Sequence, residues 1–276
     1  MNSDLAGKVV VVTGASGGIG SAMARSFAQE GARLVLHYRS GRARVDRLAR
    51  DLPGEQLIVR ADLSREAGAR RLFATAVRRF GRVDTLVANA GSWESREVPL
   101  HRMPLQQWRH TLDQVLTSAF LSLREFLRLV ARQKSGNAVL IASTAGVFGE
   151  AGHADYAAAK SAMVFGLTRS LKNEISRLAP HTARYCGGRV NCICPGWTIV
   201  PRTAAHLKNA AVVRKVTATM ALPQLARPGD IAHAAVFLSS DTLARHLTGQ
   251  TLVIAGGMEG RLLWQPHEID PAACLA

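Results

Sequence analysis

Short apolar runs rich in valine, isoleucine and leucine alternate with helix-forming segments along all 276 residues of this chain. Such alternation favours a parallel sheet, because each helix returns the chain to the same end of the sheet. We therefore expect an α/β fold with a doubly wound, seven-stranded parallel sheet and helices on both faces. The strands are expected at residues 8–13, 33–38, 56–60, 83–88, 137–142, 189–194 and 251–254, and the helices at residues 18–30, 43–51, 64–80, 105–133, 154–178 and 228–239.

No linker rich in proline, glycine and serine divides the chain. We therefore expect a single domain over residues 1–276, with two irregular segments after the last two strands. The first, at about 196–227, has the position of a lid, and the second, at about 257–276, is a C-terminal tail. An additional irregular stretch, at 179–188, has no function that its residues suggest.

Composition limits the cellular setting and the partners. No apolar run approaches the roughly 20 residues that span a bilayer, and the N-terminus has no signal-peptide pattern, so we expect a cytoplasmic protein without membrane contact. The net charge of +15 would attract anions. All but six of the 35 basic residues are scattered arginines, however, so no nucleic-acid partner is expected.

The four cysteines are Cys186, Cys192, Cys194 and Cys274. Their spacing matches neither a metal site nor a disulfide framework, so we expect buried free thiols and no metal. Cys192 and Cys194 alternate within one predicted strand and should share a face of the sheet.

The first predicted strand leads directly into a glycine-rich turn, TGASGGIG at residues 13–20, and then into a helix. Gly14, Gly18 and Gly20 permit a tight turn and a close backbone approach, so that the helix N-terminus can face a pyrophosphate. A purely structural strand-to-helix turn is the alternative, because the motif alone is a weak signal.

The end of the second predicted strand is where dinucleotide-binding folds place an acid on the adenosine ribose. This chain has His37, Tyr38, Arg39 and Ser40 there, and no carboxylate. Arg39 could bind a 2′-phosphate and Ser40 could donate a hydrogen bond to it, which favours NADP(H), with NAD(H) possible. The alternative for Arg39 is an ordinary solvated side chain.

Tyr156 and Lys160 are separated by three alanines in a segment that favours helix, so their side chains lie on one helical face. The phenol of a free tyrosine has a pKa of about 10, and a nearby ammonium group favours the phenolate. We therefore expect Lys160 to lower the pKa of Tyr156 toward a range useful for proton transfer.

Five motifs in order resemble the classical short-chain dehydrogenase/reductase family. They are TGxxxGxG at 13–20, NAG at 89–91, Ser143, Tyr156xxxLys160 and the PG pair at 195–196, with thirteen residues from Ser143 to Tyr156. The resemblance implies a Rossmann-like fold and an NAD(P)-dependent oxidoreductase that moves a hydride between the nicotinamide and a carbonyl or secondary alcohol. It also implies that Tyr156 is the general acid/base, that Lys160 binds the nicotinamide ribose, and that Ser143 binds the substrate oxygen.

The resemblance implies further cofactor contacts and a homo-oligomer, either a tetramer or a dimer. Family members associate through two long helices and the last strand, and the apolar residues 262–264 could join such an interface. The alternative for these residues is packing against their own subunit. An alternative for Asp62 is a helix cap. The implied cofactor-binding residues are Gly14, Ser16, Gly18, Ile19, Gly20, Arg39, Ser40, Asp62, Leu63, Asn89, Ala90, Gly91, Tyr156, Lys160, Pro195, Gly196 and Thr198.

Two positions depart from the family pattern. Val115 stands where the family has an asparagine that kinks the helix and holds a water touching the catalytic lysine, and Val200 stands where a threonine is usual. Gln114 or Thr117 could replace the asparagine, the relay could be dispensable, or turnover could be weak. The second reading of the chain is therefore a catalytically weak dinucleotide-binding sensor or partner-binding subunit.

The substrate itself is not predicted beyond a small carbonyl or alcohol. Trp93, His153 and Trp197 are candidates to line the pocket, with packing roles as the alternative. Glu94 and Glu97 could face a polar or cationic substrate, although solvated charges are the plainer expectation.

Overall fold

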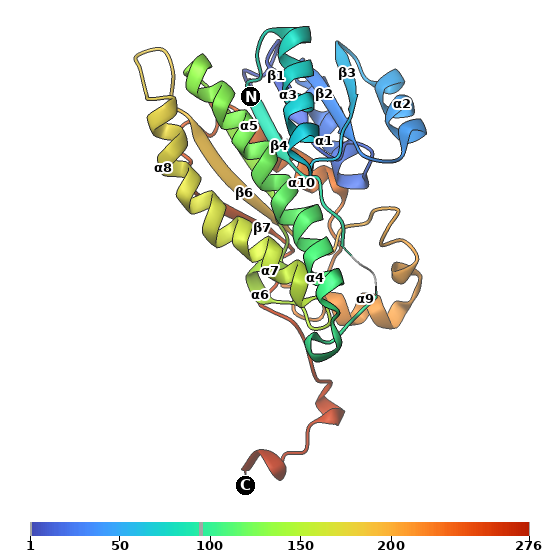
Figure 1. Ribbon diagram of the computed structural model, residues 1–276. Coiled ribbons are helices and arrows are strands. Elements are labelled where there is room, and N and C mark those ends of the chain that lie inside the picture. Colours follow the sequence, from blue (N-terminus) through green and yellow to red (C-terminus); the bar gives the residue numbers. More distant parts are fainter. Residues whose placement is uncertain (1, 94–95, 276) are drawn as a thin grey trace.

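The computed structural model describes residues 2–93 and 96–275 (Figure 1). Its seven parallel strands form one sheet in the order β3-β2-β1-β4-β5-β6-β7, so the direction of winding reverses between β1 and β4. Register is continuous across that reversal, with Val10 opposite Thr85. The strands are β1 (Val9–Val12), β2 (Arg33–Tyr38), β3 (Gln56–Arg60), β4 (Thr85–Ala88), β5 (Asn137–Ile141), β6 (Arg189–Pro195) and β7 (Thr251–Ile254).

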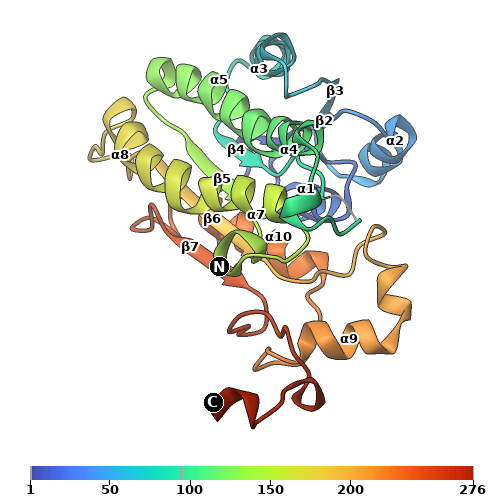
Figure 2. The ribbon, with the colours of Figure 1, turned by 60° about the horizontal axis from the view of Figure 1, so that its bottom comes forward.

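Helices cover both faces of this sheet, as Figures 1 and 2 show. Alternate valines of β1 enter two separate cores, because successive side chains of a strand point to opposite faces. Val9 and Val11 pack under one helical layer, and Val10 and Val12 pack under the other. The first layer holds α3 (Glu66–Phe80), α5 (Ser118–Gln133) and α8 (Thr168–Leu178), and the second holds α1 (Gly18–Gln29), α2 (Arg42–Asp51) and α10 (Pro228–Ser239). The expected α/β fold is confirmed.

The two long predicted helices are each interrupted by a turn of π-helix. Residues 105–133 divide into α4 (Leu105–Leu112), a π turn and α5, and residues 154–178 divide into α7 (Ala154–Ser161), a π turn and α8. At the second turn the Thr168 hydroxyl donates to the carbonyl of Met163, five residues earlier, at 2.7 Å. Side-chain bonds of this kind compete with the regular helical ladder, and sequence periodicity does not register them.

Short elements that the sequence did not predict lie in the connecting segments and in the tail. The lid carries α9 (Ala210–Thr217), where the Asn209 side chain caps the helix by accepting from the Ala211 amide at 2.9 Å. The other additions are α6 (Ala145–Phe148) and the 3-10 turns Leu100–Arg102, His206–Lys208, Pro266–Glu268 and Ala273–Leu275.

The stretch at 179–188 packs back onto the sheet. The Tyr185 hydroxyl accepts from the Gly136 amide at 2.9 Å and lies 3.2 Å from the Gly136 carbonyl, which fixes the segment beside the start of β5. Its role is therefore structural, at the end of the sheet where β5 and β6 begin, opposite the carboxyl ends of the strands.

Cys192 and Cys194 are buried on the same face of β6, as expected. All four cysteines are free, but Cys186 is only partly buried and Cys274 is exposed, so uniform burial was wrong. Cys274 lies in the C-terminal tail, which extends away from the sheet in Figure 1. Within residues 2–93 and 96–275, no helix is both long and apolar enough to cross a bilayer.

Candidate active site

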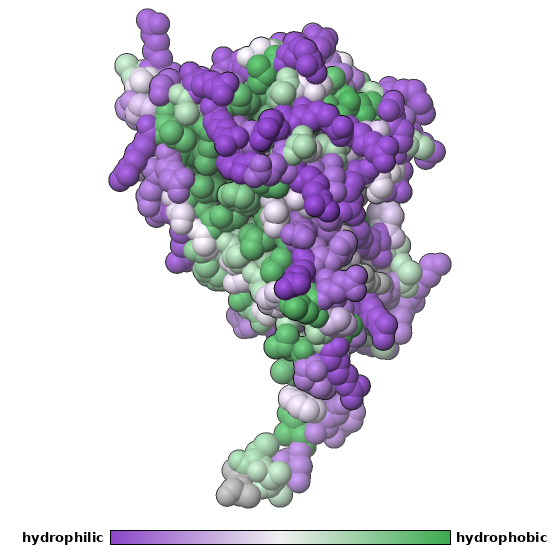
Figure 3. All heavy atoms as spheres, viewed as in Figure 1, coloured by the Kyte–Doolittle hydropathy of each residue, from purple (hydrophilic) through white to green (hydrophobic). Residues whose placement is uncertain are grey.

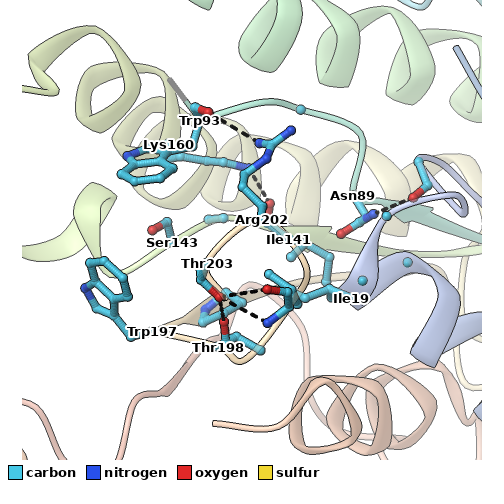
Figure 4. A pocket seen from close by; sticks show the side chains of 18 of the residues that line it. Ile19, Asn89, Trp93, Ile141, Ser143, Lys160, Trp197, Thr198, Arg202 and Thr203 are labelled. Atoms are coloured by element: carbon cyan, nitrogen blue, oxygen red, sulfur yellow. Dashed lines mark hydrogen bonds between the residues drawn. The ribbon is translucent and has the colours of Figure 1, made fainter. Parts of the chain in front are cut away.

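A cavity of about 630 Å³ lies at the carboxyl ends of the strands, beside the reversal between β1 and β4. Ligand sites of open parallel sheets occur at this position, because the loops on either side diverge there. The glycine-rich turn, the ends of β4, β5 and β6, and the lid all contribute to its walls. In Figure 4, Ile19 and Asn89 lie at one end, and Trp93 and Trp197 lie at the other.

The glycine-rich turn forms the first end, which we call the nucleotide end. Gly14 has φ +70°, a conformation that glycine adopts without strain. A Cβ on Gly20 would lie 2.2 Å from the Gly14 carbonyl oxygen, and one on Gly18 would lie 2.5 Å from Val200 of the lid. No side chain caps α1, so its first amides are left to face the cavity. An uncapped helix N-terminus beside this cavity fits a pyrophosphate.

His37 holds this turn in place, which the sequence reading missed. Its Nδ1 accepts from the Gly14 amide and its Nε2 donates to the Ala61 carbonyl, both at 3.1 Å. Burial lowers the pKa of His37 to about 4, against weaker opposing effects from Ala61 and Asp62. The neutral ring is therefore the form that links β2, β3 and the turn. A histidine within an apolar strand, two residues before Arg39, was the available signal.

Asn89 connects the predicted NAG segment to the end of β1. Its Nδ2 donates to the Thr13 carbonyl at 2.9 Å, while the Thr13 hydroxyl accepts from the amides of Asn89 at 2.8 Å and Ala90 at 2.9 Å. Asn89, Ala90 and Gly91 all line the cavity as expected.

Four predicted cofactor residues do not line the cavity: Arg39, Ser40, Asp62 and Leu63. Arg39 and Ser40 are exposed beside it, and the Ser40 carbonyl accepts from the Ser16 hydroxyl at 3.1 Å. Asp62 accepts from both the amide and the hydroxyl of Ser64, and this hydrogen bonding lowers the pKa of its carboxyl group. Asp62 therefore forms a turn with Ser64 and does not cap the helix, because α3 begins at Glu66 and no side chain caps it.

Arg44 lines the nucleotide end and was not predicted. From the first turn of α2 it reaches back, and its Nε donates to the Ser16 carbonyl at 3.2 Å. A Cβ on Gly41 would lie 2.4 Å from the Arg44 guanidinium, so the glycine leaves room for that path. The signal in the sequence was the cluster of arginines that follows Gly41.

Ser143, Tyr156 and Lys160 line the same cavity, the first at the end of β5 and the others on α7. The Lys160 Nζ lies 5.7 Å from the centre of the Tyr156 ring and donates to the Ile141 carbonyl at 2.7 Å. The Ser143 hydroxyl lies near enough to the Tyr156 phenol to act on its pKa, and it accepts from the Ala145 amide at 3.1 Å. The structure therefore brings together the three predicted catalytic side chains.

The pKa of Tyr156 does not follow the sequence prediction. Burial raises it to about 12, and the nearby Ser143 hydroxyl opposes this rise only in part. Burial also lowers the pKa of Lys160 to about 8. The expected lowering of the Tyr156 pKa was wrong for the protein alone, because loss of water outweighs the nearby ammonium group. The phenol is therefore protonated at neutral pH.

Buried Asp155 fixes the start of α7 and was not recognised as an anchor. Its Oδ2 accepts from the Thr111 hydroxyl at 2.6 Å and from the Gln107 amide at 3.2 Å, both on α4. Its Oδ1 accepts from the Tyr156 amide at 2.8 Å. These bonds hold α7, which carries Tyr156, against α4.

Val115 lies within the π turn of residues Asp113–Thr117, so the helix is distorted here without an asparagine. Val115 is fully buried and borders Gly91 beside the Lys160 Nζ. Thr117 does not substitute for the asparagine, because its hydroxyl donates to Asp113 at 3.2 Å. In the described part of the chain, the Lys160 Nζ has its hydrogen bond to Ile141 and none to Gln114.

Aromatic rings gather at the other end of the cavity, which we call the substrate end. The Trp93 ring lies 5.1 Å from His153, 6.4 Å from Trp197 and 6.0 Å from His206, measured between centroids. Trp93 and Trp197 line the cavity, whereas His153 packs behind Trp93. Glu94 lies outside the described residues.

Charged side chains also line the substrate end. They are Glu150, Arg202 and Arg261, whereas Glu97 is exposed and is not part of the wall. In the lid, the Thr203 hydroxyl donates to the Thr198 carbonyl at 2.8 Å and accepts from the Val200 amide at 3.1 Å. Thr203 therefore supplies a hydroxyl to the cavity wall beside Val200.

Comparison with known proteins agrees with this geometry. A protein-family model described as enoyl-(acyl carrier protein) reductase matches residues 14–259. The chain is 32% identical over 257 residues to a 3-oxoacyl-[acyl-carrier-protein] reductase of Synechocystis sp., covering 92% of this chain and 98% of that protein.

Two dehydrogenases are also similar. The chain is 37% identical over 258 residues to a cis-4-hydroxycyclohexanecarboxylate dehydrogenase of Sinomonas cyclohexanicum, covering 93% of this chain and 98% of that protein. It is 37% identical over 262 residues to an L-fucose dehydrogenase of Oryctolagus cuniculus, covering 92% of this chain and 86% of that protein. These matches extend over the fold and the cavity described above, and the chain belongs to the short-chain dehydrogenase/reductase family of oxidoreductases.

Proposed function

We propose that this protein is an NADP(H)-preferring oxidoreductase that interconverts a secondary alcohol and a ketone. One observation carries the proposal: Ser143, Tyr156 and Lys160 face the same cavity as the uncapped N-terminus of α1. That N-terminus would hold the pyrophosphate of the cofactor, and a bound nicotinamide would supply or accept the hydride. The names of the similar reductase and dehydrogenases accord with this reaction.

Each residue of the trio has a separate role in the proposal. Ser143 binds the substrate oxygen, and Tyr156 donates a proton to it during carbonyl reduction. Because the pKa of Tyr156 is raised to about 12, its phenol holds that proton at neutral pH and is suited to act as the acid. Lys160 binds the nicotinamide ribose, and its ammonium group stabilises negative charge that develops on the phenol during transfer.

The preference for NADP(H) rests on the absence of an acid after β2 and on the two arginines near the adenosine end. Arg39 follows β2 directly, and Arg44 lines the cavity through its bond to Ser16. A guanidinium group can bind a 2′-phosphate through two hydrogen bonds, whereas a ribose hydroxyl gives it little to bind.

We also propose a homo-oligomer, a tetramer or dimer, on the face of the two interrupted helices. Phe120 of α5 is 46% exposed and Phe165, in the second π turn, is 48% exposed. Figure 3 shows apolar residues gathered over this side of the molecule. Leu263 and Trp264 of the tail are also exposed and could join the interface. The cytoplasmic location stays a prediction.

A photometric screen of ketones and secondary alcohols with NADPH, NADP⁺, NADH and NAD⁺ tests the activity. We expect turnover, and we expect Tyr156→Phe to reduce kcat at least about a hundredfold while cofactor binding is retained, because only the acidic hydroxyl is lost. Lys8→Gln, at a charged residue away from the cavity, is the control. Tight cofactor binding without turnover of any compound would instead support the weakly catalytic sensor, which Val115 beside Lys160 favours.

A further inference from the structure

The charged and aromatic residues of the substrate end identify a class of substrate. We propose that this end binds a substrate with a compact apolar ring and an anionic group, a carboxylate in the first instance, and that Arg202 binds the anion. The inference rests on the proposed function for the position of the reacting carbon. Beyond that function, it names Arg202 as the residue that determines specificity and an anionic group as the feature of the substrate that Arg202 recognises.

Among the described residues of the substrate end, one cation, Arg202, has no ion pair. Arg261 lies 3.9 Å from Glu150 and donates to the Thr144 hydroxyl at 3.1 Å, so this pair is largely neutralised within the wall. Arg202 makes a 3.4 Å hydrogen bond to the Trp93 carbonyl, and no carboxylate among the described residues forms an ion pair with it. One main-chain bond leaves most of its five N–H donors for a ligand.

Arg202 also lines the same cavity as the catalytic side chains. It extends from the lid toward Trp93, over the cavity that holds Ser143 and Lys160, as Figure 4 shows. Its charge acts on the Tyr156 phenol and lowers the pKa of that group, against the larger effect of burial. An anion held by Arg202 would therefore belong to the same small molecule as the oxygen bound at Tyr156.

The walls between these points are apolar and aromatic. Trp93 and Trp197 meet edge to face, at 73° between their planes, and both line the cavity. Indole rings provide a large apolar surface with few conformations to lose on binding, which suits a compact ring rather than a strongly hydrated chain. A cationic substrate is disfavoured because Arg202 would repel it.

The experiment compares an anionic ketone with its neutral isostere. The value of kcat/KM is measured with NADPH for 4-oxocyclohexanecarboxylate and 4-oxocyclohexanecarboxamide, in the wild type, Arg202→Gln and Arg202→Lys. The matched control is Arg214→Gln, which removes the same charge from α9 in the same lid, outside the cavity wall. A charge-assisted hydrogen bond is worth about 1.5–3 kcal/mol, which corresponds to roughly a 10- to 100-fold effect.

We expect the wild type to prefer the carboxylate at least about tenfold and Arg202→Gln to remove that preference while the carboxamide rate changes little. Arg202→Lys should retain part of the preference, and Arg214→Gln should retain all of it. No preference in the wild type overturns the inference, as does an unchanged preference in Arg202→Gln. A rise in KM for NADPH in Arg202→Gln, equal for both ketones, also overturns it, because Arg202 would then bind the cofactor.

A binding measurement separates this inference from the proposed function. Quenching of tryptophan fluorescence by cyclohexanecarboxylate and cyclohexanecarboxamide, in the presence of NADP⁺, requires no turnover. Tighter binding of the carboxylate that disappears in Arg202→Gln supports the inference even if no ketone is reduced, and in that case only the catalytic proposal fails. Equal binding of the two compounds refutes the anion site whatever the activity.

Discussion

The protein should lose stability between pH 7 and pH 5, and replacing His37 with asparagine should make this loss much smaller. Burial lowers the pKa of His37 from 6.5 to about 4 in the folded state. Between these two values the unfolded chain binds a proton that the folded protein does not, so the free energy of unfolding falls as the pH falls. The loss begins near pH 6.5 and is complete below about pH 4.

The magnitude follows from the size of the shift. A difference of about 2.5 in pKa corresponds to roughly 3 kcal/mol over the whole range. About 2 kcal/mol of this is lost by pH 5, since unfolded histidine is then almost fully protonated and folded His37 is not. The asparagine side chain of the variant cannot titrate, but its oxygen can still accept from the Gly14 amide, as the His37 Nδ1 does at 3.1 Å.

Urea unfolding at pH 5, 6, 7 and 8, followed by tryptophan fluorescence, measures the effect. His37→Asn should be less stable than the wild type at pH 7, by about 1 kcal/mol for the lost bond to Ala61, but it should lose about 2 kcal/mol less on acidification. His101→Asn, at an exposed residue, controls for loss of a histidine. Parallel pH dependences for the wild type and His37→Asn would refute the reasoning.

Three further predictions test the rest of the site. Lys160→Met should stabilise the protein at pH 7 by up to about 3 kcal/mol in urea unfolding. Burial of the charged Lys160 destabilises the folded state at this pH, and the penalty disappears only as the pH rises from about 8 to 10.5. A less stable variant would contradict this. Arg39→Ala and Arg44→Ala should each raise the Kd for NADPH about tenfold or more while the Kd for NADH changes little in titrations of cofactor fluorescence, and equal changes would remove the 2′-phosphate assignment. Gly20→Ala should lower the free energy of unfolding by about 1–3 kcal/mol and remove most of the cofactor affinity, because its Cβ would lie 2.2 Å from the Gly14 oxygen. Unaltered thermal stability would exclude that contact.

Much of this fold could be predicted because it depends on local patterns that agree with one another. All seven strands were found within two residues of their observed ends, since each is a short apolar run between helix-forming segments. The π turns were missed because one extra residue in a helical turn leaves little mark on hydrophobic periodicity. A hydroxyl-to-carbonyl bond, that of Thr168 to Met163, accompanies the second turn.

Those parts of the candidate site could be predicted in which residue type and sequence spacing alone determine the role of a residue. Ser143, Tyr156 and Lys160 share the cavity as their spacing indicated, but the direction of the Tyr156 pKa shift did not follow, because burial cannot be read from two side chains. Arg44 and His37 were missed for a related reason. Each acts on a residue more than twenty positions earlier in the chain, and only the assembled sheet brings the partners together.

The packing of Val115 has a consequence for the timing of turnover. With a valine closing the space behind Lys160, and with Nζ bonded to the Ile141 carbonyl, the described residues provide no hydrogen-bonded chain from the amine to bulk water. We therefore expect Tyr156 to recover its proton through the mouth of the cavity, by the route that ligands use. Reprotonation of Tyr156 and departure of the product would then form a single kinetic step. Small buffer acids that fit this opening should therefore accelerate repeated turnovers but leave the first turnover unchanged.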